Sequence, residues 1–222
     1  MARRHLSIGV LFLLIIFQLY CRVYGEELNS SSGFSLGFVA NFGTNEIKFK
    51  ESHAEIDTGW LMGGGVLIEK NLSQLFSIGS GIEYRYLRNN VTMYPDTANE
   101  FDALWISHCL SMPLHLILTL KGSSSSLDLH GGVTYTYIFS SKMTADDYVV
   151  RSDDAMKYID ASQIALSGGA IFRFLVTEWS DFFMGVFGEY YLTDYIHSTN
   201  DDRTYLLQYY FRSGYMFRTD IF

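Results

Sequence analysis

Eight stretches of the chain alternate between apolar and polar positions with a period of two residues. In the first stretch, Phe34, Leu36 and Phe38 fall on one face, and Ser35 and Gly37 fall on the other. This period is typical of β-strands, in which successive side chains point to opposite faces of a sheet. The eight stretches cover residues 33–42, 57–70, 75–88, 104–120, 127–140, 159–176, 181–195 and 203–222. The pattern predicts eight antiparallel strands in an all-β protein.

The connections between these stretches alternate between short and long. Residues 71–74, 121–126 and 177–180 form the short connections, whereas the others are longer, polar and mostly acidic. The longer connections cover residues 43–56, 89–103, 141–158 and, at intermediate length, 196–202. Short turns at one end and long loops at the other are typical of bacterial transmembrane barrels. We therefore predict an eight-stranded antiparallel up-and-down transmembrane β-barrel, with both chain ends on the periplasmic side.

The polar faces of the strands help to distinguish a membrane barrel from a soluble one. A lipocalin-like carrier turns its apolar faces inward, and its outer face meets water. Here the polar faces consist mostly of Gly, Ser and Thr, which are small enough for the crowded interior of an eight-stranded barrel. Aromatic residues near the strand ends suit interfacial girdles; they are Trp60, Tyr84, Tyr86, Trp105, Tyr190 and Tyr195. A soluble periplasmic carrier of apolar ligands stays as an alternative.

The N-terminal residues have the order of a secretory signal peptide. Two arginines precede an apolar run over residues 6–20, and a small residue, Gly25, follows it. We predict a signal peptide over residues 1–25 and an outer-membrane barrel domain over residues 26–222, exported to the outer membrane. No later segment has 18 consecutive apolar residues, which excludes a helical membrane protein.

The charge of the chain excludes another class of function. The formal net charge is −8, and removing residues 1–25 takes away three arginines and no acid, which leaves −11. Nucleic-acid binding requires clustered Lys and Arg to neutralise phosphates, so no nucleic-acid partner is expected. Only Cys109 remains after cleavage, so no intramolecular disulfide is expected either.

Several charged residues fall on the faces predicted to point into the lumen. They are Glu83, Arg85, Arg173, Glu189 and Arg212. A charge in a dry interior must be paired, because an isolated one costs several kcal/mol. We predict a structural polar network that plugs the barrel. The alternative is a narrow ion path, which is less favoured because eight strands leave little free bore.

Candidate metal ligands are few. His115 and His130 lie on the polar faces of neighbouring strands, where hydrogen bonding is a better interpretation than metal binding. Acidic pairs at residues 146–147, 153–154 and 201–202 lack the spacing of a defined calcium loop. We therefore predict no metal site and no cofactor.

An enzymatic barrel is a further alternative, because barrels that act on lipid A exist. Such an enzyme needs a nucleophile, a base and an orienting group gathered at one rim. His197 and Ser198 follow a predicted strand end, with Asp194 nearby. Three common residues in a polar loop do not make a triad, so we predict no catalytic residues and no enzyme activity.

One stretch carries a family resemblance. Residues 106–120, with Leu110-Ser111-Met112-Pro113-Leu114 at the centre, resemble the fourth strand of the PorT-like outer-membrane barrels of the Bacteroidetes type. These barrels carry an aliphatic-Pro-aliphatic step there. The resemblance implies an accessory role in secretion or envelope assembly. Because proline removes one ladder hydrogen bond, a bulge or bend is expected at Pro113.

The C-terminus and the loops imply partners. Phe222 is similar to the terminal aromatic residue read by barrel-assembly machinery, although its parity is opposite to that of Phe217. A bulge near residues 219–220 would restore the usual parity. The expected partners are therefore outer-membrane lipid and lipopolysaccharide, the assembly machinery, and a protein bound through the long loops.

Overall fold

The fold was analysed in a computed structural model that describes residues 33–48, 54–93, 101–122, 124–145, 148–150, 156, 159–194 and 204–219. The predicted signal peptide, Tyr195 and Phe222 lie outside these residues. The described strands are β1 (Phe34–Lys48), β2 (Ala54–Ile56), β3 (Gly59–Asn71), β4 (Phe76–Met93), β5 (Phe101–Lys121), β6 (Ser125–Ala145), β7 (Tyr148–Val150), β8 (Ser162–Thr177), β9 (Ser180–Tyr191) and β10 (Tyr205–Arg218). Within the described ranges, no helix is long and apolar enough to cross a membrane.

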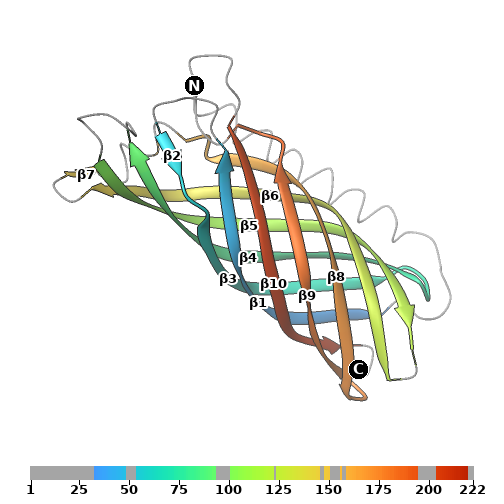
Figure 1. The fold of residues 1–222 in the computed structure, drawn as a ribbon. Coiled ribbons are helices and arrows are strands. Elements are labelled where there is room, and N and C mark those ends of the chain that lie inside the picture. Colours follow the sequence, from blue (N-terminus) through green and yellow to red (C-terminus); the bar gives the residue numbers. More distant parts are fainter. Residues whose placement is uncertain are drawn as a thin grey trace. The chain divides into compact units, whose positions relative to one another are not determined.

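Eight long strands form a closed antiparallel ring (Figure 1). Each strand pairs with the next long strand along the chain, and β1 pairs with β10 to close the ring. The short strands β2 and β7 pair with the loop ends of β4 and β6. The eight-stranded antiparallel barrel predicted from the alternation is therefore confirmed.

The strands are strongly staggered around the ring. The register can be followed from Leu36 through Ile68, Ser80, Leu114, Val133, Leu166, Tyr190 and Leu207. The path returns to β1 at Glu46, ten residues beyond its start. Such a stagger requires strands that tilt against the barrel axis, and it leaves an interior that side chains fill.

Several strands extend further at the loop end than the sequence pattern predicts. β1 continues to Lys48, β4 to Met93 and β6 to Ala145, so pairing persists inside stretches that we expected to be loops. Figure 1 shows β5, β6 and β7 reaching beyond their neighbours at this end. The outward side chains there include Arg88, Asn90 and Lys142. Because the outward faces of these strand ends are mostly polar, while apolar residues such as Val91 and Ala103 point inward, the alternation of the lipid-facing segments does not continue into them.

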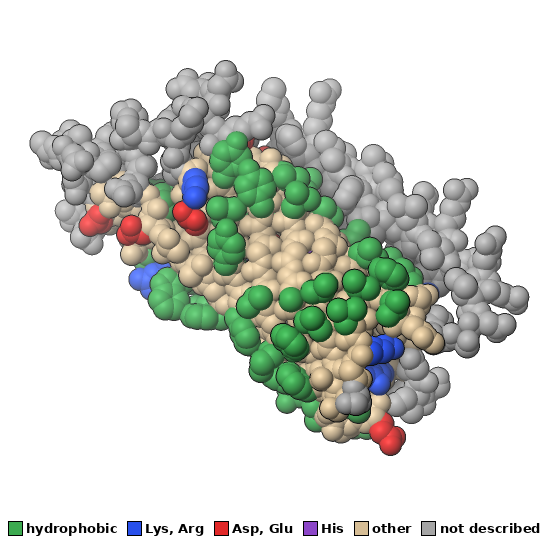
Figure 2. Space-filling model, turned by 45° about the vertical axis from the view of Figure 1, so that its right-hand side comes forward, with side chains coloured by type: hydrophobic (Ala, Val, Ile, Leu, Met, Phe, Trp, Pro, Cys, Tyr) green, Lys and Arg blue, Asp and Glu red, His purple; other side chains and the backbone are tan. Residues whose placement is uncertain are grey.

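The apolar faces of the strands point outward. Phe38, Ile82 and Val186 expose 57%, 60% and 61% of their surface, whereas Asn41 and Glu83 on the opposite faces are buried. In Figure 2, hydrophobic side chains cover much of the visible barrel wall, and the charged side chains gather toward its two ends. This is the inside-out arrangement of a transmembrane barrel, with an apolar band facing lipid.

The predicted girdle position of Trp105 is wrong. Trp105 is buried at 6% exposure, and its Nε1 donates a hydrogen bond of 2.7 Å to Ser141 Oγ. It shares parity with Ser107 and Cys109, which also point inward. The girdle assignment followed residue type and position near a strand end, but strand alternation decides the face.

The expected irregularity near Pro113 is divided between two places. In the β4–β5 ladder, Ser80 pairs with Leu114 and the next pair is Glu83 with Ser111, so the residues around Pro113 fall between pairs. The bulge itself lies in the β5–β6 ladder, where the register shifts between His108 and Cys109. Pairing with β4 is therefore interrupted around Pro113, which lacks an N–H, whereas the bulge places one extra residue, Phe139, on β6.

Inward-facing glycines allow close approach of neighbouring strands, which gives a matched pair of variants. A Cβ on Gly214 would lie 2.0 Å from the Phe38 carbonyl oxygen and 2.7 Å from the Phe183 ring. A Cβ on the outward-facing Gly131 would meet nothing within 4 Å. We expect Gly214→Ala to lower the free energy of unfolding by about 1–3 kcal/mol, and Gly131→Ala to leave it unchanged. Urea unfolding in lipid vesicles measures both, and equal effects would contradict the packing.

Candidate functional site in the barrel interior

The middle of the barrel holds a buried cluster of two arginines and two glutamates, which we name the ionic quartet. Glu83 and Arg85 lie on β4, Glu189 lies on β9 and Arg212 lies on β10. All four are buried at 0–2% exposure. They point inward because each occupies the polar parity of its strand, and the curvature of the ring brings β4 across the lumen from the neighbouring strands β9 and β10. The formal charges of the quartet sum to zero.

Arg85 and Glu189 form the strongest pair of the quartet. Arg85 Nη1 donates to Glu189 Oε2 at 2.6 Å, and Nη2 donates to Glu189 Oε1 at 2.9 Å. This two-point geometry fixes the guanidinium against the carboxylate. Nη2 also donates to Glu83 Oε2 at 3.2 Å. Glu83 is shared, because Arg212 Nη2 donates to its other oxygen.

Neutral side chains satisfy much of the remaining hydrogen-bonding capacity. Asn41 Nδ2 donates to Glu83 at 2.7 Å, and its carbonyl oxygen accepts from Arg212 Nε at 3.1 Å. The Tyr210 hydroxyl donates to Glu189 at 2.7 Å. Buried charges are tolerated when paired and hydrogen-bonded in this way. The quartet is therefore built as a closed set and not as a row of charges along a path.

Aromatic rings support the arginines. The Arg212 guanidinium carbon lies 4.3 Å from the centroid of the Phe187 ring, and that of Arg85 lies 5.0 Å from the Tyr210 ring. Phe187 and Tyr210 stack with centroids 5.6 Å apart. Arginine binds aromatic faces through the ring quadrupole, so these contacts help to hold the quartet in position.

Arg173 does not join the quartet. Arg173 Nη2 contacts both Glu69 oxygens, at 2.7 and 2.6 Å, and its Nε donates to Asp128. These three residues form a second cluster at the short-turn end of the barrel. Ser167, which contacts the polar network through Thr134, precedes Arg173 by six residues on β8. Six residues span about 20 Å along a strand, which places Arg173 out of reach of the quartet.

Many side chains at the loop end of the interior are apolar, and they lie beside a hydrogen-bonded pair of buried asparagines, Asn45 and Asn89. Ile47, Leu87, Val91, Ala103 and Leu206 are all buried there at 5% exposure or less. The register brings Ile47 beside Leu206 and Val91 beside Ala103. This apolar layer lies between the quartet and the long loops. The lumen is therefore filled by paired charges in its middle and by apolar packing nearer the loops.

The two predicted interior histidines do approach one another. The rings of His115 and His130 lie 5.8 Å apart at nearly a right angle, and His115 Nε2 lies 2.7 Å from Ser167 Oγ. Across the described ranges, no group of three or more His, Cys, Asp or Glu is placed to bind a metal. The contacts of His115 are those of a hydrogen-bonded interior residue.

The candidate catalytic group near His197 and the acidic pairs of the loops lie mostly outside the residues that the structure describes. Asp194 is described and exposed, but His197 and Ser198 lie outside the described residues, as do the three acidic pairs of the loops. The structure does contain residues that the sequence analysis missed. Tyr210 has the inward parity of Gln208 and Arg212, so a stricter reading of alternation would have placed it in the lumen.

Comparison with known proteins gives structural neighbours only. No protein-family model and no curated protein sequence matches the chain. The crystal structure of the outer membrane protein OprG from Pseudomonas aeruginosa is similar, with a TM-score of 0.52 and 15% identity, covering 85% of this chain and 96% of that one. The crystal structure of Neisserial surface protein A has a TM-score of 0.49 and 11% sequence identity, and the match covers 83% of this chain and 96% of that one. The crystal structure of a major outer membrane protein from Thermus thermophilus has a TM-score of 0.48 and 12% sequence identity, and the match covers 83% of this chain and 99% of that one.

The fold and the comparison with OprG define the class of the protein. The chain forms a closed eight-stranded antiparallel barrel of the kind found in outer-membrane proteins. The outward apolar band is typical of this class of fold, and the inward ionic quartet is the feature of this chain from which a function can be argued.

Proposed function

We propose that the protein is an integral outer-membrane barrel with a sealed interior, which acts structurally or by assisting partners at its loop end. The observation that carries the proposal is the neutral ionic quartet of Glu83, Arg85, Glu189 and Arg212, buried behind an apolar outer wall. The signal sequence expected over residues 1–25 and the fold similarity to OprG support the outer-membrane location.

The orientation of the side chains argues against a soluble carrier. A carrier of apolar ligands needs an apolar cavity and a polar outer wall. Here Phe38 and Val186 face outward, and Arg85 and Glu189 fill the middle of the lumen. An apolar ligand in that position would displace paired charges, which is strongly unfavourable.

The accessory role is drawn from the PorT-like resemblance of the strand around Pro113. It implies that the barrel assists secretion or envelope assembly through partners bound at its loops. Activity on lipid A, lost when His197 or Ser198 is changed, would instead favour the enzyme hypothesis. Catalysis is not part of the proposal, since the charged groups of the quartet are engaged with one another.

Electrical recordings test the sealed interior. Purified barrel inserted into planar lipid bilayers is expected to give no stepwise currents, because the quartet and the apolar layer occupy the lumen at two levels. Parallel gel analysis of the inserted protein checks that it is folded. Stepwise currents from the folded wild-type barrel would contradict a sealed interior and favour the ion-path interpretation.

A further inference from the structure

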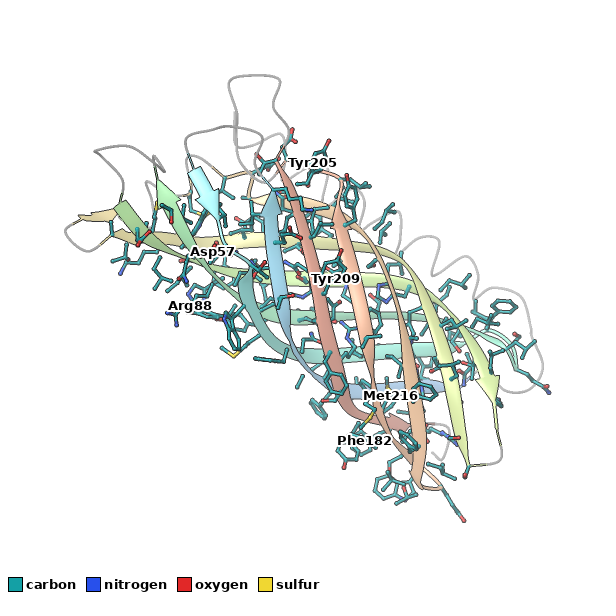
Figure 3. All side chains as sticks on the ribbon, in the orientation of Figure 1. Asp57, Arg88, Phe182, Tyr205, Tyr209 and Met216 are labelled. Atoms are coloured by element: carbon teal, nitrogen blue, oxygen red, sulfur yellow. The ribbon has the colours of Figure 1, made fainter. Side chains whose placement is uncertain are left out.

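The outer surface near the loop ends of β4, β5 and β6 carries two exposed cations in one row, which we name the cation patch. Arg88 pairs in register with Ile106, and Ile106 pairs with Lys142, so their outward side chains lie side by side. The backbones of Arg88 and Lys142 lie about 10 Å apart, because one strand, β5, separates them. Arg88 is seen on the outer surface in Figure 3, near the end of the barrel where Asp57 lies. Both side chains are long enough to converge on one group between them.

An aromatic cluster lies next to the cation patch, on the side nearer the apolar band. The Tyr84 hydroxyl lies 2.6 Å from His108 Nδ1, and the His108 ring lies 5.5 Å from the Tyr86 ring and 6.2 Å from the Phe139 ring. Aromatic residues with a polar edge favour the boundary between hydrocarbon and head groups. The cluster therefore marks this boundary, with the cation patch on its head-group side.

Among the described residues, the two cations of the patch lack the partners that Lys48 and Lys70 have, as does the exposed Lys121 at the short-turn end. Neither Arg88 nor Lys142 has an ion pair or hydrogen-bonding partner for its side chain within the described part of the chain. By contrast, Lys48 pairs with Glu46 at 3.3 Å, and Lys70 at the short-turn end lies over the Phe34 ring.

Two acids in the described part of this region have no ion pair or hydrogen bond with the cations of the patch. Asp102 lies further toward the loop end of β5 and accepts a hydrogen bond of 2.9 Å from Thr92. Asp57 is exposed beyond the end of β3, with its carbonyl oxygen accepting from Asn89. Two exposed cations side by side at the head-group boundary make a locally positive surface in a chain of net charge −8, and such a surface attracts anionic groups.

We propose that the cation patch binds a phosphate group of lipid A in the outer leaflet, with the acyl chains of that lipid lying along the aromatic cluster. The inference rests on the proposed outer-membrane location, which turns the loop end toward the outer leaflet. Arginine and lysine at a membrane surface bind anionic head groups, and arginine makes charge-assisted hydrogen bonds with phosphate oxygens. The aromatic faces favour a lipid over free phosphate.

Binding of diphosphoryl lipid A to the purified barrel in detergent micelles tests the site. The variant Arg88→Gln/Lys142→Gln is expected to bind about 25-fold more weakly, from about fivefold for each cation near the membrane surface. Lys48→Gln is the matched control, because it removes an exposed cation from another sector, and it should bind as the wild type does. Arg88→Lys keeps the charge and should retain most of the affinity.

Three outcomes would overturn the site. Unchanged binding by the double variant, equal loss in Lys48→Gln, or equal affinity for dephosphorylated lipid A would each contradict it. Phosphatidylglycerol binding as tightly, or full displacement by inorganic pyrophosphate, would contradict the assignment to lipid A. Each protein is first tested for a heat-dependent gel shift. A wild-type barrel without the shift contradicts the proposed function, whereas shifted barrels with unchanged lipid A binding contradict only this site.

Discussion

Replacing Arg85 with methionine is expected to lower the free energy of unfolding by about 3–5 kcal/mol. Arg85 is fully buried, and its loss leaves Glu189 without its two-point partner and Glu83 with Arg212 as its remaining cation. A buried carboxylate without its cation is costly, because no water replaces the lost donor. Urea unfolding of the barrel in lipid vesicles, followed by tryptophan fluorescence, measures the change.

Two further variants make this result interpretable. Arg218→Met removes an arginine whose side chain is 44% exposed and paired with Asp181, so it should cost less than about 1 kcal/mol. Arg85→Met/Glu189→Leu removes the pair as a whole and should recover most of the stability, since paired charges often give way to apolar groups at little cost. If the free energy of unfolding of Arg85→Met alone lies within about 1 kcal/mol of the wild-type value, the quartet must lie in water.

Placing an arginine at Val186 should destabilise the barrel by about 2–4 kcal/mol, the cost of that side chain near the bilayer midplane. Val186 lies midway along β9 and exposes 61% of its surface, and Phe211 is its neighbour across the ladder. In lipid, the outward arginine must leave water. Equilibrium unfolding in vesicles again measures the effect.

The corresponding control lies at the loop end of the same chain segment. Asp194→Arg changes an exposed residue just beyond β9 and should leave the stability unchanged. Val186→Arg without effect in vesicles would mean that the outer wall does not contact lipid. That result would contradict the membrane orientation while leaving the barrel topology intact.

The alternation of residues predicted which side of the wall each side chain occupies, but not how far along the barrel it lies. Asn41, Glu83 and Glu189 point inward, as their parity requires. Arg173 also points inward, yet it belongs to a different cluster from Arg85. The ten-residue stagger of the ring decides which inward residues lie at the same height in the barrel, and alternation within one strand does not determine this stagger.

The loop ends and the girdle were harder to predict for different physical reasons. Beyond the apolar band, hairpin pairing continues to Lys48 and Ala145, where backbone hydrogen bonds hold the strands and the outer face is polar. Trp105 is directed inward by its parity and bonded to Ser141, although its residue type suits a girdle. The cation patch was missed because its two cations are 54 residues apart in the sequence and meet only through the register with Ile106.

The central claim is that the apolar faces of a closed barrel meet lipid in the outer membrane. Expression in a diderm host, followed by gel electrophoresis of the outer-membrane fraction with and without boiling, tests it most directly. Closed membrane barrels resist detergent until heated, so we expect a band that changes mobility only on boiling. A soluble periplasmic product with no such shift would contradict the claim, and the apolar faces would then have to line a ligand cavity.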